Sequence, residues 1–522
     1  MKKKYAFDLS FLFLFILLAF IGYFFIKELY YYIIILPLVI YYMIMAIILS
    51  GSTDTVSSFL FYDKKLLSHE FLNTFVATNI GFFSSIIFSA AMGYSYGYSA
   101  MIWGPLTWAL GLVLIIFLLK TGKLLPHLKS NVTVHSFISN RFAGTSIEKI
   151  LLRILTSTIS IILLFSLIIV ELKALLFVIS PFMPQLSPSI IISAIAIITF
   201  LYVFITGYKG VVKTDFKQLL ILILGTCSIV IAITLNSNIV GGNKFVFSIN
   251  KVFDLGFLNI LSLFVISIPY LICTMDMWQR LIATSESDAI DQTIIRNTVR
   301  SHIYSIIIFS MLFIIFIIMG MFTYNIDSTI NDPNRIIPVF IEYINNSGVA
   351  GFIIVSIILI TILSAVLSTI DTIMITVTQS YLFDLYPVIF KKGQFNDDIN
   401  SLSSENNYKM VNISKYFIAI LAIIVVLFQF IEIANYFNFL WSVYGLVVCM
   451  FPSIIIGILS TRKYSFYSSF ISILAGFLIS ATIGYYGTFV LNNFDIVTIA
   501  PVIGLIVSFS LFGIIEIFMK WK

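Results

Sequence analysis

The sequence is poor in charge and in cysteine for its length. Only 10% of its 522 residues are Asp, Glu, Lys or Arg, whereas soluble domains contain ~25%. The three cysteines, Cys227, Cys273 and Cys449, lie in apolar stretches, so neither a disulfide framework nor a metal cluster is predicted. Hydrophobic residues make up 60% of the chain, which is more than a water-soluble core could bury. These proportions exclude a soluble enzyme, a nucleic-acid-binding protein and a disordered scaffold. They predict a polytopic membrane protein.

The apolar runs divide into membrane-spanning helices by length alone. Residues 71–119 hold 49 consecutive uncharged positions, about 73 Å of helix at ~1.5 Å per residue. A bilayer core of ~30 Å takes about 20 residues, so this run crosses the membrane twice. The same arithmetic predicts an all-α fold of about 14 transmembrane helices, at residues 9–27, 29–51, 71–94, 98–119, 149–179, 187–207, 214–236, 255–278, 301–324, 346–382, 412–431, 436–460, 465–490 and 496–518.

Basic residues set the orientation of these helices. With the amino terminus in the cytoplasm, 25 of the 30 Lys and Arg residues fall in inner segments, in keeping with the positive-inside rule. Lys2–Lys4 before an apolar run is typical of a signal peptide, but no small-residue cleavage site follows Leu9–Ile26, which favours an uncleaved anchor. We therefore predict a multi-pass protein of the inner or plasma membrane with both termini in the cytoplasm.

Two polar interruptions predict breaks in otherwise apolar helices. One is Phe75–Gly81, early in the third helix, and the other is Ser267–Tyr270, where Pro269 removes a backbone donor. Helix breaks in corresponding positions of two halves indicate the binding site of a transporter, because they leave carbonyl oxygens free. Each feature also has a simpler interpretation, with Gly81 as a close-packing residue and Pro269 as a kink.

A third polar segment, residues 364–372, lies inside one long predicted helix. Ala365, Ser368 and Thr369 are spaced i, i+3 and i+4, so they share one face. Two hydroxyls beside a backbone carbonyl form an oxygen site suited to a hard monovalent cation. Contact between packed helices is the alternative, since Ser and Thr are enriched wherever membrane helices meet.

Six segments resemble motifs of the sodium:solute symporter family. Two of them belong to the basic stretches Gly207–Gln218 and Trp278–Ala283, which by themselves are typical of solvated inner loops. The six segments occur in the family's order, at residues 58–65, 133–142, 209–218, 279–280, 364–372 and 441–452. Because they are collinear over about residues 52–460, the resemblance is specific.

This resemblance implies a fold similar to the leucine transporter (LeuT-like). Such a fold has two inverted five-helix repeats, with core helices 1 and 6 broken at the membrane centre. The implied divisions are two N-terminal helices (1–55), a cytoplasmic loop (56–70), the first repeat (71–245), the second repeat (246–460) and two C-terminal helices (461–522).

The resemblance also implies residues that bind sodium. The family's shared sodium site falls, position by position, on the carbonyls of Ala77, Ile80 and Ala365 and the hydroxyls of Ser368 and Thr369. Some members have a second sodium site, which here falls on Asp215, Ser368, Asp371 and Thr372. The aspartate at 371 changes the charge of that second site.

The same register implies that Asn79, Ser84 and Tyr270 face the central cavity. Tyr270 matches the aromatic inner gate of the sugar-transporting members. Those members carry Gln at the position of Ser84 and more polar residues near Tyr270, where this chain has Leu271 and Ile272, so a sugar is disfavoured.

Three further ionisable residues, Glu171, Lys173 and Asp276, interrupt apolar sequence. Each lies at or near a predicted helix end. Long polar side chains in such places usually extend to the membrane surface, so these three are expected to reach water.

The predicted function is import of a small polar organic solute with Na+, driven by the Na+ gradient. Na+ is a co-transported ion, and no cofactor and no catalytic residue is predicted. The expected partners are the solute, Na+ and the lipid bilayer, without nucleic acid, and the oligomeric state is left open. A membrane solute sensor of the same fold is one alternative. A membrane-embedded transferase is another, disfavoured because the histidines form no cluster in the sequence: His69, His127, His135 and His302.

Overall fold

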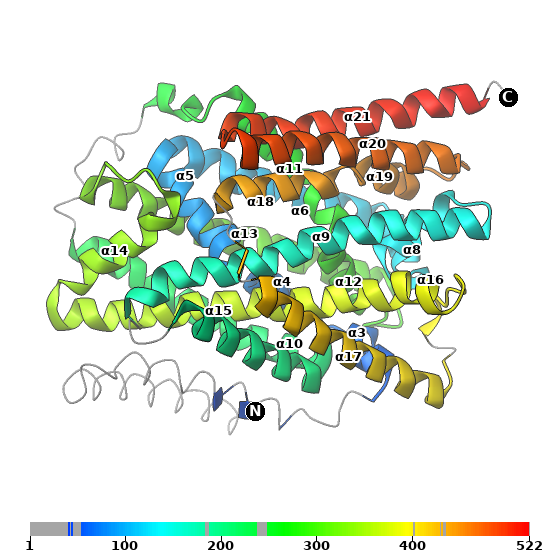
Figure 1. Cartoon of the computed structure of the whole chain (residues 1–522), viewed down its shortest axis with the longest axis horizontal. Coiled ribbons are helices and arrows are strands. Elements are labelled where there is room, and N and C mark those ends of the chain that lie inside the picture. The colour runs from blue at the N-terminus through cyan, green and yellow to red at the C-terminus, as the bar shows by residue number, and fades with distance from the viewer. Residues whose placement is uncertain are drawn as a thin grey trace.

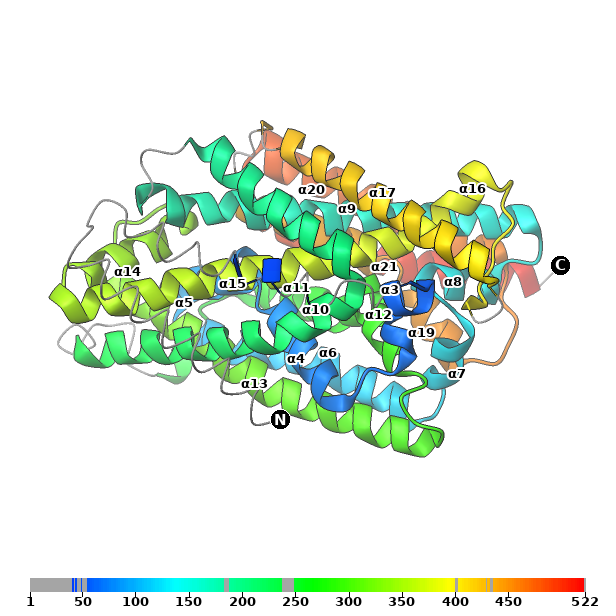
Figure 2. The ribbon, with the colours of Figure 1, turned by 90° about the horizontal axis from the view of Figure 1, so that it is seen from below.

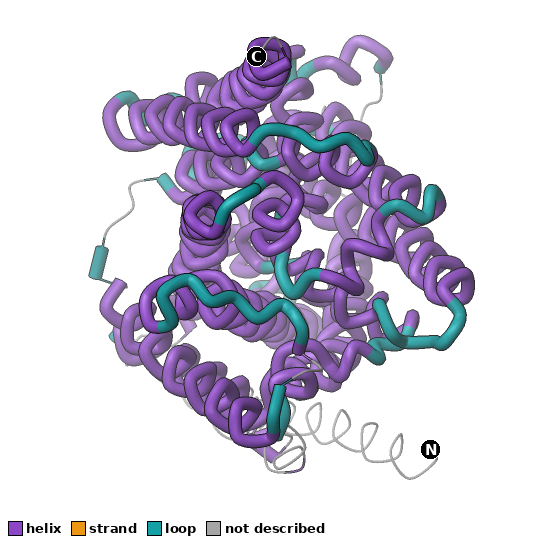
Figure 3. Tube along the Cα trace, turned by 90° about the vertical axis from the view of Figure 1, so that its right-hand side faces the viewer, coloured by secondary structure: helices purple, strands orange, loops and turns teal. Residues whose placement is uncertain are grey.

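The computed structural model describes residues 54–182, 187–236, 248–399, 402–428, 430–431 and 435–520, together with 40, 41, 43, 44 and 48. These described residues form helices and loops, without a strand (Figure 1). The long helices run mostly along the long axis of the molecule, so that Figure 3 shows many of them end-on. The helices are α3 (Val56–Phe61), α4 (Ser68–Asn79), α5 (Phe88–Tyr96), α6 (Tyr98–Lys120), α7 (Leu124–Ser130), α8 (Val134–Phe142), α9 (Ser146–Ile179), α10 (Pro188–Leu235), α11 (Phe257–Cys273), α12 (Met275–Thr284), α13 (Asp291–Ile326), α14 (Ile336–Asn345), α15 (Gly348–Ser380), α16 (Tyr386–Phe390), α17 (Ser404–Phe428), α18 (Tyr436–Val448), α19 (Phe451–Leu459), α20 (Phe466–Tyr485) and α21 (Phe494–Lys520).

In the described part of the chain, nine helices are long and apolar enough to cross a membrane, or eleven if each of two bent pairs counts as one span. One of the nine, α10, consists of two helices that meet at Gly207, whose φ of 55° favours glycine. A loop was predicted between helices 187–207 and 214–236, but the second helix begins directly after Gly207. The predicted helices 9–27 and 29–51 lie almost wholly outside the described residues. The all-α, polytopic fold is confirmed.

The first bent pair is the predicted break after Phe75. Here α4 ends at Asn79, and the chain bends by 70° before continuing in the π-helix η2 (Phe82–Ile87) and α5. The last hydrogen bond of α4 joins the Ile80 N–H to the Val76 carbonyl at 3.1 Å. Carbonyl groups that follow Val76 therefore lie at the open end of a helix, where no further turn supplies donors.

The second break is not at Pro269, where it was predicted, but at Thr274. Pro269 lies inside α11, and the 44° bend follows Cys273, where Thr274 is extended (φ −82°, ψ 138°). Trp278 Nε1 donates to the Ile272 carbonyl at 2.8 Å, which satisfies an acceptor near this break. A membrane helix tolerates proline where neighbouring groups compensate for the missing donor, so proline alone does not end it.

The polar stretch of α15 lies in the interior of the bundle, and every residue from Thr361 to Ser380 is buried. α15 packs against α4, α9 and α10, and Figures 1 and 2 both show it crossing the molecule between them. α20 and α21 pack together beside α18 on one side, whereas α17 lies against α10 on the other. The central helices can therefore carry polar residues without exposing them to lipid.

Candidate functional site

The break in α4 faces the polar stretch of α15. Thr369 Oγ1 lies 3.0 Å from the Thr78 carbonyl on α4 and 3.0 Å from the Ala365 carbonyl on its own helix. The hydroxyls of Thr78 and Thr372 are 3.0 Å apart and join the same two helices. Side-chain and backbone oxygens of both helices thus gather where α4 ends.

The other residues implied for the shared sodium site lie around this contact. Ala77 and Ile80 are buried at the end of α4. Ser368 directly precedes Thr369, but its hydroxyl donates to Asp215 Oδ1 on α10 at 2.7 Å. Donation uses the hydroxyl proton only, so the lone pairs of this oxygen stay available to a cation.

Two buried carboxylates lie beside Ser368 without a protein cation bonded to them. Asp215 accepts the hydrogen bond from Ser368, but its Oδ2 and both oxygens of Asp371 have no hydrogen-bond partner among the described groups. The buried Thr74 hydroxyl faces Asp215 and the buried Gln218 side-chain amide faces Asp371, although neither makes a hydrogen bond. Burying unpaired polar and charged groups is costly, so this cluster is suited to hold a cation.

Glu171 does not reach water, contrary to the expectation from the sequence. It is 0% exposed, and its carboxylate accepts from the N–H of Phe83 (3.0 Å), the N–H of Ser84 (3.0 Å) and the Ser84 hydroxyl (2.7 Å). It thereby caps the second half of the broken helix, whose first N–H groups have no helical acceptor. A β-carbon on Gly81 would stand 2.5 Å from Glu171 Oε1 and 3.0 Å from Thr369 Oγ1, so glycine is what lets these oxygens approach the break.

A pocket opens beside the break. All three residues implied to face the cavity, Asn79, Ser84 and Tyr270, line it. Its cavity volume is only ≈ 30 Å³, so it is narrow in this conformation. The other lining residues are Thr78, Ser85, Trp108, Leu164, Leu167, Asp276, Thr369, Ile373 and Tyr444.

Asp276, Gln279 and Arg280 are also buried rather than solvated, which corrects two expectations from the sequence. Asp276 Oδ2 accepts from Arg280 Nη1 at 2.9 Å, so the pair is neutral. The Gln279 amide donates to the Leu60 carbonyl (3.1 Å), and its oxygen accepts from the Thr376 hydroxyl (2.7 Å). α12 is a buried half-helix in which Gln279 bonds to neighbouring segments and Arg280 pairs within the helix, while Asp276 Oδ1 and Arg280 Nε have no hydrogen-bond partner.

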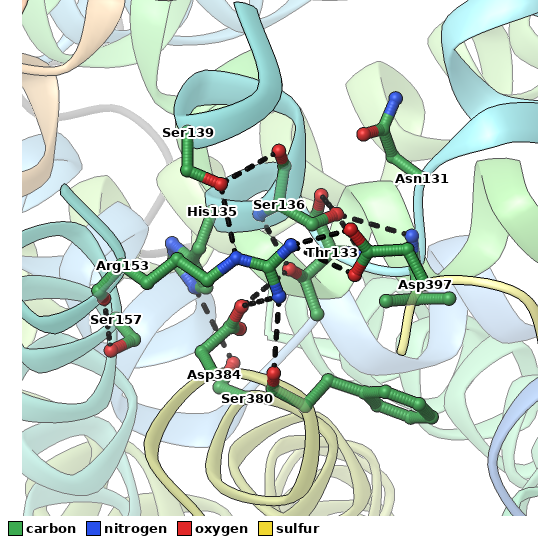
Figure 4. Close-up of polar contacts among 12 residues, drawn as sticks. Asn131, Thr133, His135, Ser136, Ser139, Arg153, Ser157, Ser380, Asp384 and Asp397 are labelled. Atoms are coloured by element: carbon green, nitrogen blue, oxygen red, sulfur yellow. Dashed lines mark hydrogen bonds and ion pairs between the residues drawn. The ribbon is translucent and has the colours of Figure 1, made fainter. Parts of the chain in front are cut away.

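A second polar group, which we call the Arg153 cluster, lies near the opposite end of α9 from Glu171 (Figure 4). Arg153 is 1% exposed and pairs with Asp397 through Nη2 (2.6 and 2.8 Å) and with Asp384 through Nη1 (3.3 Å). Its Nε donates to Ser139 (3.0 Å), and Thr133 donates to Asp384 (3.0 Å). The cluster joins α8 and α9 to the segments on either side of α16.

Comparison with known proteins agrees with this architecture. A model of the sodium:solute symporter family matches residues 66–476. The chain is similar to the solved structure of a Na+-coupled sialic acid symporter in a substrate-bound, outward-open state, at 16% identity, covering 93% of this chain and 97% of that one, with a TM-score of 0.68. It is also similar to a mutant manganese transporter of Eremococcus coleocola, at 12% identity and 90% and 99% coverage, with a TM-score of 0.50. No curated protein matches the chain.

Sequence analysis missed three interactions at these sites. They are the cap that Glu171 places on Ser84, the Asp215–Ser368 hydrogen bond and the Arg153–Asp384 pair, whose partners are 87, 153 and 231 positions apart. Spacing within one helix cannot reveal such partners. A single acid inside a long apolar run was the only local signal for Glu171, and it was assigned to the surface.

Proposed function

Because the chain belongs to the sodium:solute symporter family, we propose that it imports a small polar organic solute together with Na+ by alternating access. The observation that carries the proposal is the meeting of the α4 break with the hydroxyls of α15, directly beside a pocket. Open helix ends and their carbonyls are the groups that coordinate Na+ in transporters with broken helices. We place the protein in the inner or plasma membrane with both termini cytoplasmic and its two repeats at 71–245 and 246–460.

The proposed sodium site has five ligands, namely the carbonyls of Ala77, Ile80 and Ala365 and the hydroxyls of Ser368 and Thr369. Its main support is the position of the Thr369 hydroxyl, 3.0 Å from carbonyls of both α4 and α15. A bound Na+ would draw these oxygens toward itself and replace the hydroxyl-to-carbonyl hydrogen bond. All five ligands are uncharged, which suits an ion that must also be released.

We propose a second sodium site at Asp215, Ser368, Asp371 and Thr372. Its support is the set of unpartnered carboxylate oxygens beside Ser368. Two carboxylates leave one negative charge uncompensated when a single Na+ is bound. We therefore expect this site to retain Na+ more strongly than the uncharged first site.

Sodium would act on transport by joining α4 to α15. An ion changes a conformational equilibrium only through its different affinities for the two states, so it favours the state in which both helices supply ligands. The solute then binds in the pocket that Asn79, Ser84 and Tyr270 line. Because coupling between two ligands is reciprocal, the solute must in turn raise the affinity for Na+.

The test is Na+ binding and solute uptake by the purified full-length protein. Radioactive Na+ should bind saturably to the protein in detergent, and unlabelled Na+ but not K+ should compete. In proteoliposomes, a mixture of labelled polar solutes should accumulate with an inward Na+ gradient and not with an inward K+ gradient. Absence of Na+ binding would overturn the proposal, and Na+ binding without any uptake would indicate a sensor instead.

A further inference from the structure

The walls of the pocket contain aromatic rings and an acid but no basic residue among the described lining residues. The rings of Trp108 and Tyr270 pack edge to face with their centroids 5.9 Å apart. Those of Tyr270 and Tyr444 do the same with their centroids 4.9 Å apart. Aromatic faces attract cations through the negative side of the ring. Asp276 also lines the pocket, and its Oδ1 has no hydrogen-bond partner.

The formal charge next to the pocket is negative. Asp276 is neutralised by Arg280, but no Lys, Arg or His is hydrogen-bonded or ion-paired to Glu171 among the described residues. Its carboxylate holds Ser84 and lies near Thr369, and both of those residues line the pocket. Glu171 does not itself line the pocket, but it is fully buried and bonded to Ser84 in the pocket wall.

The cap on the broken helix uses both oxygens of Glu171 as acceptors. Oε2 accepts from the Phe83 N–H and Oε1 from the N–H and hydroxyl of Ser84, whereas a glutamine would offer only one acceptor oxygen. A buried ionised group in a membrane is costly and usually has a partner. Here the described groups provide donors but no basic partner, so a cation from outside the protein, either Na+ or the solute, would balance the charge.

We propose that the solute is a small organic cation with an ammonium group, held against the aromatic rings of the pocket with Glu171 as the compensating charge. This inference rests on the proposed function, because it names the class of solute that the symporter carries. The narrow space favours a compact head group. An anionic solute would lie near Glu171 without any basic lining residue to pair with.

The first test compares solutes that differ only in charge, on the unmodified protein in Na+ buffer. Choline is paired with its uncharged isostere 3,3-dimethylbutan-1-ol, ethanolamine with propan-1-ol, and glycolate serves as the anion. At least one cation should raise the thermal midpoint saturably and bind at least about tenfold more tightly than its isostere, since a buried charge pair contributes more than ~1.4 kcal/mol. If neither cation binds better than its isostere, or if glycolate binds best, the inference is wrong.

The second test is Glu171→Gln, with Glu405→Gln on an exposed part of α17 as the matched control. The amide keeps one of the two acceptor oxygens of the cap and removes the charge. Glu171→Gln should weaken binding of the preferred cation at least about tenfold, and it should weaken binding of radioactive Na+ in the absence of solute by a smaller factor. A larger loss of Na+ binding than of cation binding would assign Glu171 to the ion and overturn the inference.

A third variant keeps the inference testable if Glu171→Gln does not fold. Tyr444→Leu preserves an apolar side chain but removes one ring, so the preference for the cation over its isostere should fall at least about threefold. An unchanged preference would contradict the aromatic contact.

Failure of the proposed function has a different signature. Na+-dependent uptake of a neutral or anionic solute rejects the cation only, whereas cation binding indifferent to Na+ rejects the symport.

Discussion

The Arg153 cluster and the central site both bury carboxylates, but they balance the charge in different ways. In the Arg153 cluster, Asp384 and Asp397 meet a guanidinium of the protein itself. In the central site, Asp215 and Asp371 have no ion pair with a basic residue among the described pairs, and three of their four oxygens are unpartnered. One region has a basic residue of the protein bonded to its acids, and the other has none among the described pairs.

This difference separates a structural role from a binding role. A buried ion pair that is fully bonded fixes neighbouring elements relative to one another, because breaking it leaves a charge without compensation. A carboxylate that lacks a protein cation can exchange its counter-ion with the solution. We therefore expect changes in the Arg153 cluster to alter stability, and changes in the central site to alter ligand affinity.

The largest effect should follow from Arg153→Met. This change leaves two acids without a cation and should lower the free energy of unfolding by about 3–5 kcal/mol, the usual cost of removing one partner of a buried pair. Chemical unfolding in detergent measures it, with exposed Arg296→Met as the control. Adding Asp384→Asn to Arg153→Met should restore part of the loss. A loss below ~1 kcal/mol would show that the cluster is not structural.

A smaller effect, on affinity instead of stability, should follow from Ser368→Ala/Thr369→Ala. Hydrogen bonds to charged groups contribute roughly 1.5–3 kcal/mol each, and ion–hydroxyl contacts should be similar, so each hydroxyl lost should weaken Na+ binding at least about tenfold. Titration of uptake against Na+ measures this. Apparent affinity for the solute should fall at low Na+ and partly recover at high Na+. If the Na+ dependence of uptake is unchanged in this variant, Na+ does not bind at this face of α15.

His135, next to Arg153 in Figure 4, should make stability depend on pH. Burial, followed by the charge of Arg153, lowers the pKa of His135 to about 3. Below the unfolded pKa of ~6.5, the unfolded chain gains a proton that the folded protein does not, so stability falls as the pH falls. The loss at pH 5 should be about 2 kcal/mol. Unfolding at pH 7 and pH 5 should show a smaller loss in His135→Gln, while exposed His69→Gln should behave like the wild type.

The smallest effect should come from the ion pair of Lys64 and Glu286. Their contact is 2.9 Å, but the Glu286 side chain is 41% exposed, so water screens the pair. Glu286→Gln should lower the free energy of unfolding by less than ~1 kcal/mol, and the loss should shrink further in high salt. A loss as large as that of Arg153→Met would show that burial does not explain the difference between the clusters.

Several features of this protein were determined by its sequence alone. The low content of charged residues and the lengths of the apolar runs predicted an all-α membrane protein. Every segment that spans a bilayer must be apolar over about the same length and must satisfy its backbone hydrogen bonds internally. The order of six motifs indicated the family. Gly81 in a polar stretch predicted the first helix break, which the structure places between Asn79 and Phe82. Each of these features can be read from one stretch of sequence or from the order of several stretches along the chain.

Other features were decided only by the tertiary structure. Pro269 predicted the wrong position for the second break, because the conformation of Thr274 and the bond from Trp278 to Ile272 set where α11 ends. Glu171 was expected at the surface, but it caps a helix half by accepting from the N–H of Phe83, 88 positions earlier in the chain. The charge state of a polar site depends on which distant helices supply its donors and counter-ions. Hydropathy and spacing along one helix contain no information about those partners.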